Sequence, residues 1–383
     1  MARDPSDTGA SPCPTLASVF SAEPPVSGGH GLSPEALLAG PRGRRLCVDL
    51  LDDRLTALGG RVRREWADAC YYARRPHRDA RRCAGKLHEC VRIADPAGSP
   101  FDGGTLMASL QMTVSGASYW EQPAGEDVGF ADAAAWEALR PVAHAVAVAV
   151  AGLPEVRWWA KLLDGSRQRC TQFLGEHPQQ QPQLGGTAGL ARAWREDTRE
   201  DEQSGRSGPR DVNVFYSGRW WSSPALSGLP VTTRRMGGAG LALVEDADGR
   251  GWQLARCWPV TAQDGARVFE ISGPEHWAAL VERYPLEVTR SRRPDWRQAT
   301  GWAGRWMIPD YAAVAADWDA IHVTVAGYLT TAGVVMPAGA DARTMLAGWD
   351  PDATWWLSDV LSFTGPPEDW REEEDAPFGW IQI

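Results

Sequence analysis

The chain has 383 residues, of which 43% are hydrophobic and 23% charged, a composition typical of folded globular proteins. Its net charge of −10 argues against nucleic acid or an anionic membrane surface as the partner of the whole chain, because both repel an acidic protein. The longest apolar run, residues 142–153, is shorter than the roughly 20 residues that span a membrane. No secretory signal is visible, and the seven cysteines are irregularly spaced. We therefore expect a soluble, cytoplasmic protein with free thiols.

The N-terminal part of the sequence shows mainly helical periodicity. Residues 1–32 contain few large apolar side chains and are predicted to be disordered. Ser33, Pro34 and Glu35 provide a capping residue, a first-turn proline and an early acid, which together predict the start of a helix. We predict a mainly helical domain over residues 33–186, with helices at 46–58, 61–73, 78–93, 105–113 and 131–151 and strands at 156–163 and 168–174.

The second part begins after a charged stretch. Residues 187–210 contain a short predicted helix, 188–199, and a linker rich in charge, glycine and serine, which we take as the domain boundary. From residue 211 to 383 we predict an α+β domain with a mostly antiparallel sheet, a turn at 246–249 and a solvated acidic tail at 372–375. The predicted elements are helices at 274–283 and 309–317 and strands at 212–216, 229–234, 241–245, 252–259, 268–271, 286–290, 320–329 and 354–357.

Several common sequence motifs of catalysis are absent. The sequence contains no P-loop, no HExxH, no paired CxxC and no Gly-x-Ser-x-Gly, so it identifies no cofactor. The glycine-rich residues 237–240 lead toward a predicted strand and are expected to form a turn. Five potential ligands between residues 70 and 90 lack the closely spaced pairs typical of zinc sites, so we predict no metal site; they are Cys70, His77, Cys83, His88 and Cys90.

Tryptophan is the most conspicuous residue type. The chain has 20, of which 14 follow Asp211 and give the second domain its tryptophan-rich character. Adjacent residues on a strand point to opposite faces, so each Trp-Trp pair is expected to direct one indole toward the core and one elsewhere. Trp220 and Trp355 are therefore candidates for stacking against a ligand. Packing within the core is the alternative interpretation.

His322 is the candidate acid–base residue. Strand periodicity places His322 and Thr324 on one face of the predicted strand 320–329. A histidine beside a hydroxyl could transfer protons near neutral pH, with Glu270 as a carboxylate partner. The alternative is a buried histidine whose ring nitrogens are satisfied by hydrogen bonds.

Two predicted strands end in clusters of hydroxyl groups and arginines. Thr232 and Arg234 belong to the first cluster, and Arg292 belongs to the second, within residues 288–293. If the two strands are neighbours, these groups would converge on an anion pocket suited to phosphate or carboxylate. The alternative is that the arginines are exposed and make only weak surface pairs.

Segments in both parts of the chain resemble segments of uncharacterised proteins of GC-rich bacteria. These are residues 40–47, Pro309-Asp310-Tyr311 and residues 318–322. The resemblance implies neither an activity nor any site residue.

Two functional hypotheses follow from the sequence. The first is an intracellular binding or interaction protein, whose tryptophan- and arginine-lined C-terminal surface contacts an anionic small molecule or a protein partner. The second is an enzyme acting on a phosphorylated or nucleotide-like substrate. In that hypothesis arginines hold the anion, an indole stacks on the substrate and a histidine–carboxylate pair transfers protons; the residues concerned are Arg234, Arg292, Trp220, Trp355, His322 and Glu270.

Overall fold

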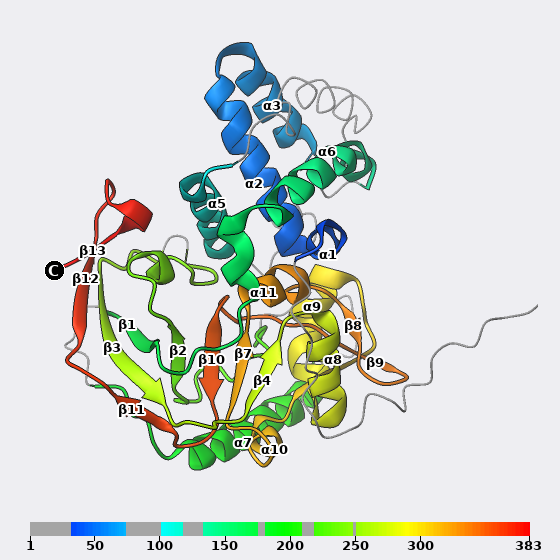
Figure 1. The fold of residues 1–383 in the computed structure, drawn as a ribbon. Coiled ribbons are helices and arrows are strands. Elements are labelled where there is room, and N and C mark those ends of the chain that lie inside the picture. The colour runs from blue at the N-terminus through cyan, green and yellow to red at the C-terminus, as the bar shows by residue number, and fades with distance from the viewer. Residues whose placement is uncertain (1–31, 74–100, 118–132, 175–180, 209–217, 248–249) are drawn as a thin grey trace, which may run out of the picture.

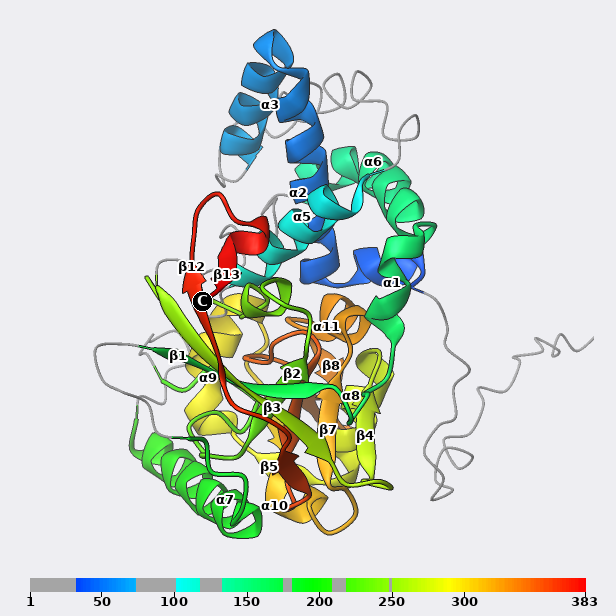
Figure 2. The ribbon, with the colours of Figure 1, turned by 60° about the vertical axis from the view of Figure 1, so that its left-hand side comes forward.

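The computed structural model describes residues 32–73, 101–117, 133–174, 181–208, 218–247 and 250–383. A group of helices lies above a large, strongly twisted sheet, and further helices cover one side and the lower end of that sheet (Figures 1 and 2). Four predictions lie wholly or mostly outside the described residues: the disordered segment 1–32, the helix 78–93, the strand 212–216 and the second half of the turn 246–249. The same holds for most of the cluster of potential metal ligands between residues 70 and 90.

The N-terminal part is helical, as predicted. Ser33 caps the first helix by accepting a hydrogen bond from the backbone N–H of Ala36 at 3.1 Å, and the last of these helices continues through Pro141. A 3-10 helix follows at Pro154–Ala160. The predicted strand at 156–163 is therefore wrong, because Pro154 fixes the backbone for a helical first turn. The helices are α1 (Pro34–Ala39), α2 (Pro41–Leu58), α3 (Gly60–Ala73), α5 (Gly103–Ser115) and α6 (Ala133–Ala151).

The large sheet is mixed but mostly antiparallel, which confirms the predicted α+β fold. Its strand order is β13-β12-β3-β1-β2-β10-β7-β4, with β11 also paired to β3; only β4 and β7 run parallel. The strands are β1 (Gln168–Leu174), β2 (Val231–Arg234), β3 (Leu254–Ala262), β4 (Val268–Ile271), β7 (Ala320–Val323), β10 (Ala353–Trp356), β11 (Leu361–Phe363), β12 (Glu368–Glu372) and β13 (Trp380–Gln382).

Strand β1 connects the two halves of the sequence. It lies between β3 and β2 near the middle of the sheet, although it precedes the charged stretch that suggested a domain boundary. The sheet therefore begins at Gln168 and not after residue 210. Helix α7 (Thr187–Ser204) is longer than predicted and packs against α9 (Thr289–Thr300) and α10 (Tyr311–Val314). Residues 200–204 are thus part of a packed helix and not of a free linker.

A smaller sheet and two more helices complete the fold of the described residues. The smaller sheet has the order β5-β6-β9-β8, formed by Pro285–Glu287, Arg305–Pro309, Ala342–Thr344 and Met336–Pro337. Helix α8 (Pro274–Arg283) confirms its prediction, and α11 (Val325–Thr331) follows directly on β7.

Three predicted strands and the predicted tail need correction. The strand at 320–329 ends at Val323 because the Thr324 hydroxyl caps α11. The strand at 286–290 ends at Glu287, and α9 begins at Thr289. Residues 241–245 form no strand and follow a 3-10 turn at Ala239–Leu241. The acidic residues 372–375 are exposed but are not a tail, since the chain returns to pair β13 with β12.

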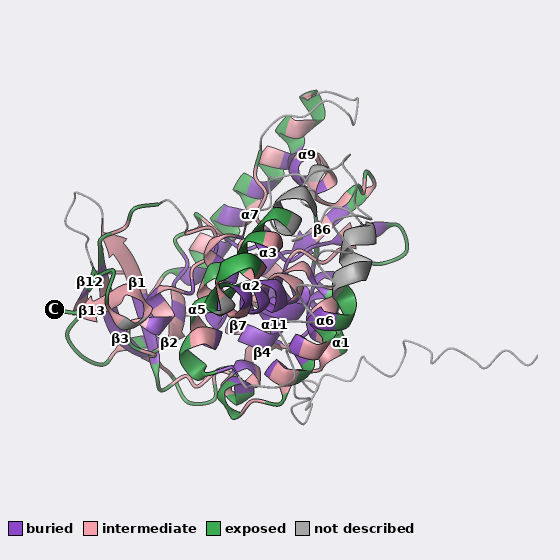
Figure 3. Cartoon of the chain, turned by 90° about the horizontal axis from the view of Figure 1, so that it is seen from above, coloured by how far each residue is buried: buried purple, intermediate pink, exposed green. Residues whose placement is uncertain are grey.

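The core runs without interruption from the helical part into the sheet, and in the view from above the buried segments gather around α2, α11 and β7 (Figure 3). Leu50 of α2, Val146 of α6, Trp277 of α8 and Ile321 of β7 belong to the same buried cluster. Seven of the 14 tryptophans after Asp211 are buried, so packing is the main use of this residue type here. They are Trp258, Trp277, Trp296, Trp306, Trp349, Trp356 and Trp370. No helix within the described ranges is long and apolar enough to cross a membrane.

Glu245 joins the helical part to the sheet. Its carboxylate accepts hydrogen bonds from the hydroxyl of Tyr328 in α11 at 2.8 Å and from the backbone N–H of Trp349 at 3.1 Å. The Nε atom of Arg42, in α2, lies 3.9 Å from the same carboxylate, and all of these groups are buried. The chain around Glu245 is thereby fastened to the helices above the sheet.

Helix α11 approaches β4 too closely for any side chain at Gly327. A Cβ atom there would lie 2.1 Å from the backbone oxygen of Ile271. We expect Gly327→Ala to lower the free energy of unfolding by about 1–3 kcal/mol or more, because the backbone itself must move. On α7, a Cβ at Gly189 meets nothing within 4 Å, so Gly189→Ala should be neutral or stabilising. Urea denaturation measures both, and equal effects would contradict the close approach.

Candidate functional site

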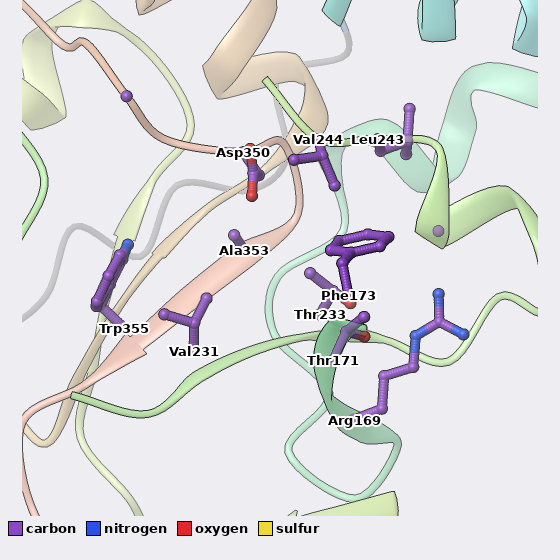
Figure 4. A pocket seen from close by; sticks show the side chains of 12 residues that line it. Arg169, Thr171, Phe173, Val231, Thr233, Leu243, Val244, Asp350, Ala353 and Trp355 are labelled. Carbon is purple, nitrogen blue, oxygen red and sulfur yellow. The ribbon is translucent and has the colours of Figure 1, made fainter. Parts of the chain in front are cut away.

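A cavity of about 260 Å³ lies against one face of the large sheet, over β1, β2 and β10. We call it the Arg169 cavity (Figure 4). Its floor consists of side chains from the three strands, and its upper side is formed by segments 240–244 and 348–350, which adjoin Glu245. The lining residues are Arg169, Thr171, Phe173, Val231, Thr233, Gly240, Leu243, Val244, Gly348, Asp350, Ala353 and Trp355.

The strand register brings the floor together. Thr233 of β2 lies opposite both Arg169 of β1 and Ala353 of β10. In the next row, Val231 lies opposite Trp355. Because alternate residues of a strand share a face, the two rows present a guanidinium, a hydroxyl, aliphatic groups and an indole to the same space.

Arg169 is the unusual residue of this cavity. It is only 2% exposed, yet its side chain forms no hydrogen bond or ion pair with any residue that the structure describes, and its Nε and Nη2 atoms are buried without a partner. Burial lowers the pKa of the guanidinium, an effect that the nearby Cys257 and Glu368 oppose. Gly240 permits this arrangement, since a Cβ there would lie 2.6 Å from Nη2. A buried cation without a direct hydrogen-bond or ion-pair partner is costly and is well suited to bind an oxyanion.

Asp350 provides the second charged group. Its Oδ1 atom accepts a hydrogen bond of 2.7 Å from the backbone N–H of Glu245. Burial raises the pKa of Asp350 to about 6, although that hydrogen bond and the nearby Arg250 oppose the shift. At neutral pH most of the carboxyl is therefore ionised and can accept a hydrogen bond from a ligand.

Two aromatic rings form the sides of the cavity. In Figure 4, Trp355 and Phe173 stand on either side of Ala353 and Thr233. Phe173 stacks on Trp252 with 4.3 Å between ring centroids, and Trp355 makes an edge contact with Trp349 at 6.3 Å. Both rings are thereby held in place, as the sides of a preformed binding cavity should be.

The predicted pair His322 and Glu270 lies on the opposite face of the same sheet. Glu270 of β4 is the direct neighbour of His322 on β7, and its Oε2 atom lies 2.6 Å from Nδ1 of the imidazole. On the other side, Nε2 of His322 lies 3.4 Å from Oδ1 of Asp352, which in turn pairs with Arg234 at 3.3 Å. We call this row of alternating charges, Glu270–His322–Asp352–Arg234, the charged chain.

The charged chain is shielded from solvent. His322 is fully buried, the backbone N–H of Leu163 donates to Glu270, and Arg234 donates to the backbone oxygen of Leu162. Burial alone would lower the pKa of His322, but the carboxylates of Glu270 and Asp352 outweigh it and raise the pKa to about 9. The imidazole is thus a protonated ion-pair partner at neutral pH.

Of the remaining predicted residues, only Trp355 lines the Arg169 cavity. The others serve packing, capping or ion pairing. Thr232 donates to Gln168 and accepts from the indole of Trp356, and Thr324 caps α11. Trp220 makes an edge contact with Trp221. Arg292 lies on α9, where it pairs with Asp201 at 2.9 Å, so it shares neither a partner nor an element with Arg234. The two arginine clusters do not converge as expected, because the second one is helical and not the end of a strand.

Sequence reasoning missed Arg169, Thr171, Thr233, Gly240 and Asp350. The strand 168–174 was predicted, and the alternation of a strand puts Arg169, Thr171 and Phe173 on one face. What the pattern could not reveal was that the arginine would be buried without a carboxylate. Comparison of the chain with protein-family models, with curated proteins and with solved structures found no match in any of the three.

The charged chain predicts a pH dependence of stability. The pKa of His322 is raised in the folded protein from an ordinary value of 6.5 to about 9, so the folded state binds this proton more tightly than the unfolded state. The resulting stabilisation is complete below pH 6.5 and is lost as the pH rises toward 9. Its size is on the order of 3 kcal/mol. Urea titrations at several pH values measure it.

His322→Gln is the matched variant for this measurement. The variant should be less stable than the native protein at pH 6. Its free energy of unfolding should fall much less between pH 6.5 and 9 than that of the native protein. The same slope in both proteins would show that other groups cause the decline.

In contrast to His322→Gln, substitution of Arg169 is expected to stabilise the ligand-free protein. Replacing this unpaired, buried guanidinium with the similarly long side chain of Met should raise the free energy of unfolding of the ligand-free protein by about 1–4 kcal/mol, because the desolvation cost disappears. Arg256→Met on the neighbouring strand β3 removes a partly exposed arginine paired with Asp369 and should change stability by about 1 kcal/mol or less. A destabilised Arg169→Met protein would contradict the view that the guanidinium has no direct partner.

Proposed function

We propose that the protein binds a small organic acid in the Arg169 cavity. The observation that carries this proposal is the buried guanidinium of Arg169, which lines the cavity without a protein partner among the described residues. Binding sites for small molecules are typically apolar cavities with a few fixed polar groups, and this cavity combines one cation, one carboxyl and two hydroxyls with aromatic and aliphatic walls.

The arrangement favours a single carboxylate attached to a flat apolar group. One guanidinium fork matches the two oxygens of one carboxylate. Trp355 and Phe173 offer ring faces or edges for an apolar body, and a volume of about 260 Å³ limits that body to a small molecule. Asp350 adds an acceptor for a ligand hydroxyl or amine. This proposal develops the binding hypothesis drawn from the tryptophans and arginines of the C-terminal part.

We propose a structural role for His322 rather than an acid–base role. Its imidazole is fully buried, and both ring nitrogens face carboxylates. A catalytic histidine must reach a substrate proton, and this one is covered by the segment around Leu163. The Glu270–His322 contact supports the pairing expected from the sequence but not a reaction.

Benzoate and benzamide test the proposal, because they share a shape and differ in charge. By isothermal titration calorimetry at pH 7.5, benzoate should bind and benzamide should bind at least tenfold more weakly, since only benzoate pairs with Arg169. Arg169→Met should abolish benzoate binding, whereas the control Arg256→Met should leave it unchanged. Equal binding of benzoate to the native and Arg169→Met proteins would refute the site.

A further inference from the structure

A second cavity, of about 490 Å³, lies where β2 ends and the chain approaches β1. It shares no lining residue with the Arg169 cavity, and Arg234, which belongs to the charged chain, forms part of its wall. We call it the basic cavity. Its polar lining residues are Lys161, Asp164, Arg167, Arg234 and Arg235, and its apolar ones are Trp158, Leu162 and Met236.

Four cations converge on the basic cavity from three segments. Lys161 follows the 3-10 helix, Arg167 immediately precedes β1, Arg234 is the last residue of β2, and Arg235 follows it. The segments are held together by the backbone, since the N–H of Arg235 donates to the backbone oxygen of Arg167 at 3.0 Å. The backbone of the fold therefore brings the four cationic residues to one place.

Among the residues that the structure describes, only two of these four cations form ion pairs with nearby carboxylates. Arg234 pairs with Asp352, and Arg235 pairs with Glu368 at 2.5 Å. Lys161 and Arg167 have no ion pair within the described part of the chain. Asp164 also lines the cavity, and its carboxylate offsets one positive charge, since hydrogen bonds from Ser166 and the nearby Arg234 and Arg167 lower its pKa. The four cations still outnumber the three carboxylates Asp164, Asp352 and Glu368, in a protein whose net charge is −10.

We propose that the basic cavity binds a phosphate monoester whose organic part lies against Trp158. A carboxylate needs only one guanidinium fork, whereas the three oxygens and double charge of a phosphate monoester call for more than one cation. The unpaired guanidinium of Arg167 and the point charge of Lys161 supply them, and Arg234 and Arg235 offer further N–H donors beside their own carboxylates. Trp158 is partly buried and held by an edge contact with Trp159, so its indole offers an apolar surface beside the cations. This site is independent of the organic-acid site proposed above.

Phenyl phosphate and benzoate separate the two sites in the full-length protein. Calorimetry in low-salt buffer should show that phenyl phosphate binds the native protein. The double substitution Lys161→Gln/Arg167→Gln should weaken that binding at least tenfold and leave benzoate binding unchanged. It should also leave the fold intact, because both side chains are exposed and unpaired. Arg169→Met should have the reverse effect: benzoate binding is lost and phenyl phosphate binding is retained.

A charge-matched control guards against general electrostatic attraction. Arg63→Gln/Arg64→Gln removes two exposed cations from α3, and it should leave phenyl phosphate binding unchanged. The proposal is overturned if this control weakens binding as much as the Lys161/Arg167 variant does, if only Arg169→Met abolishes phosphate binding, or if phenyl phosphate does not bind at millimolar concentration. Failure of the organic-acid site alone would appear in the benzoate titrations.

Discussion

The charged chain Glu270–His322–Asp352–Arg234 is the constraint on which the central sheet and both cavities depend. It links β4, β7, the turn before β10, and β2 through groups that are largely removed from water. Removing one partner of a buried ion pair is strongly destabilising, so each member holds the next in place. Asp352 adopts a positive φ of 59°, and the backbone N–H of Ala353 donates to the oxygen of Asp350. The turn that completes the chain therefore also sets the position of Asp350 in the Arg169 cavity.

The charges on one face of the central strands are paired with each other, whereas Arg169 on the other face has no direct partner among the described residues. On β2, the side chain of Arg234 lies on the face of the charged chain, where it pairs with Asp352. The side chain of Thr233 lies on the other face, which carries Arg169. The same alternation on β10 puts Trp356 into the core and Trp355 into the cavity wall. Paired charges of the first face contribute to stability and order, while an unpaired, buried cation does the reverse. Such a cost is expected at a position that serves binding, as proposed for Arg169, because stability and function can oppose each other there.

Local patterns in the sequence predicted most elements but not the site. The capping residue Ser33, the period of α2 and the alternation in β1 depend on neighbours within a few residues, and those predictions were correct. Thr324 was assigned to a strand because its hydroxyl suits either a strand face or a helix cap, and only the packing of α11 on β4 decides between them. Glu270 and His322 were paired correctly from residue type. Arg169 was not predicted as a site residue, because its lack of a partner depends on which residues of distant strands lie opposite it.

Two buried arginines of this protein differ in their partners and not in their residue type or burial. Arg292 is fully buried like Arg169, but Asp201 and the backbone oxygen of Trp221 occupy its guanidinium, so it fastens α9 to its surroundings. Arg169 has equal burial without such partners and faces a cavity with two aromatic sides. The segments around Gly240 and Asp350 that bound this cavity are tied through Glu245 to α11 and to the helices above. The helical part thus holds the segments that form the upper side of the cavity in place over the sheet and keeps the cavity open.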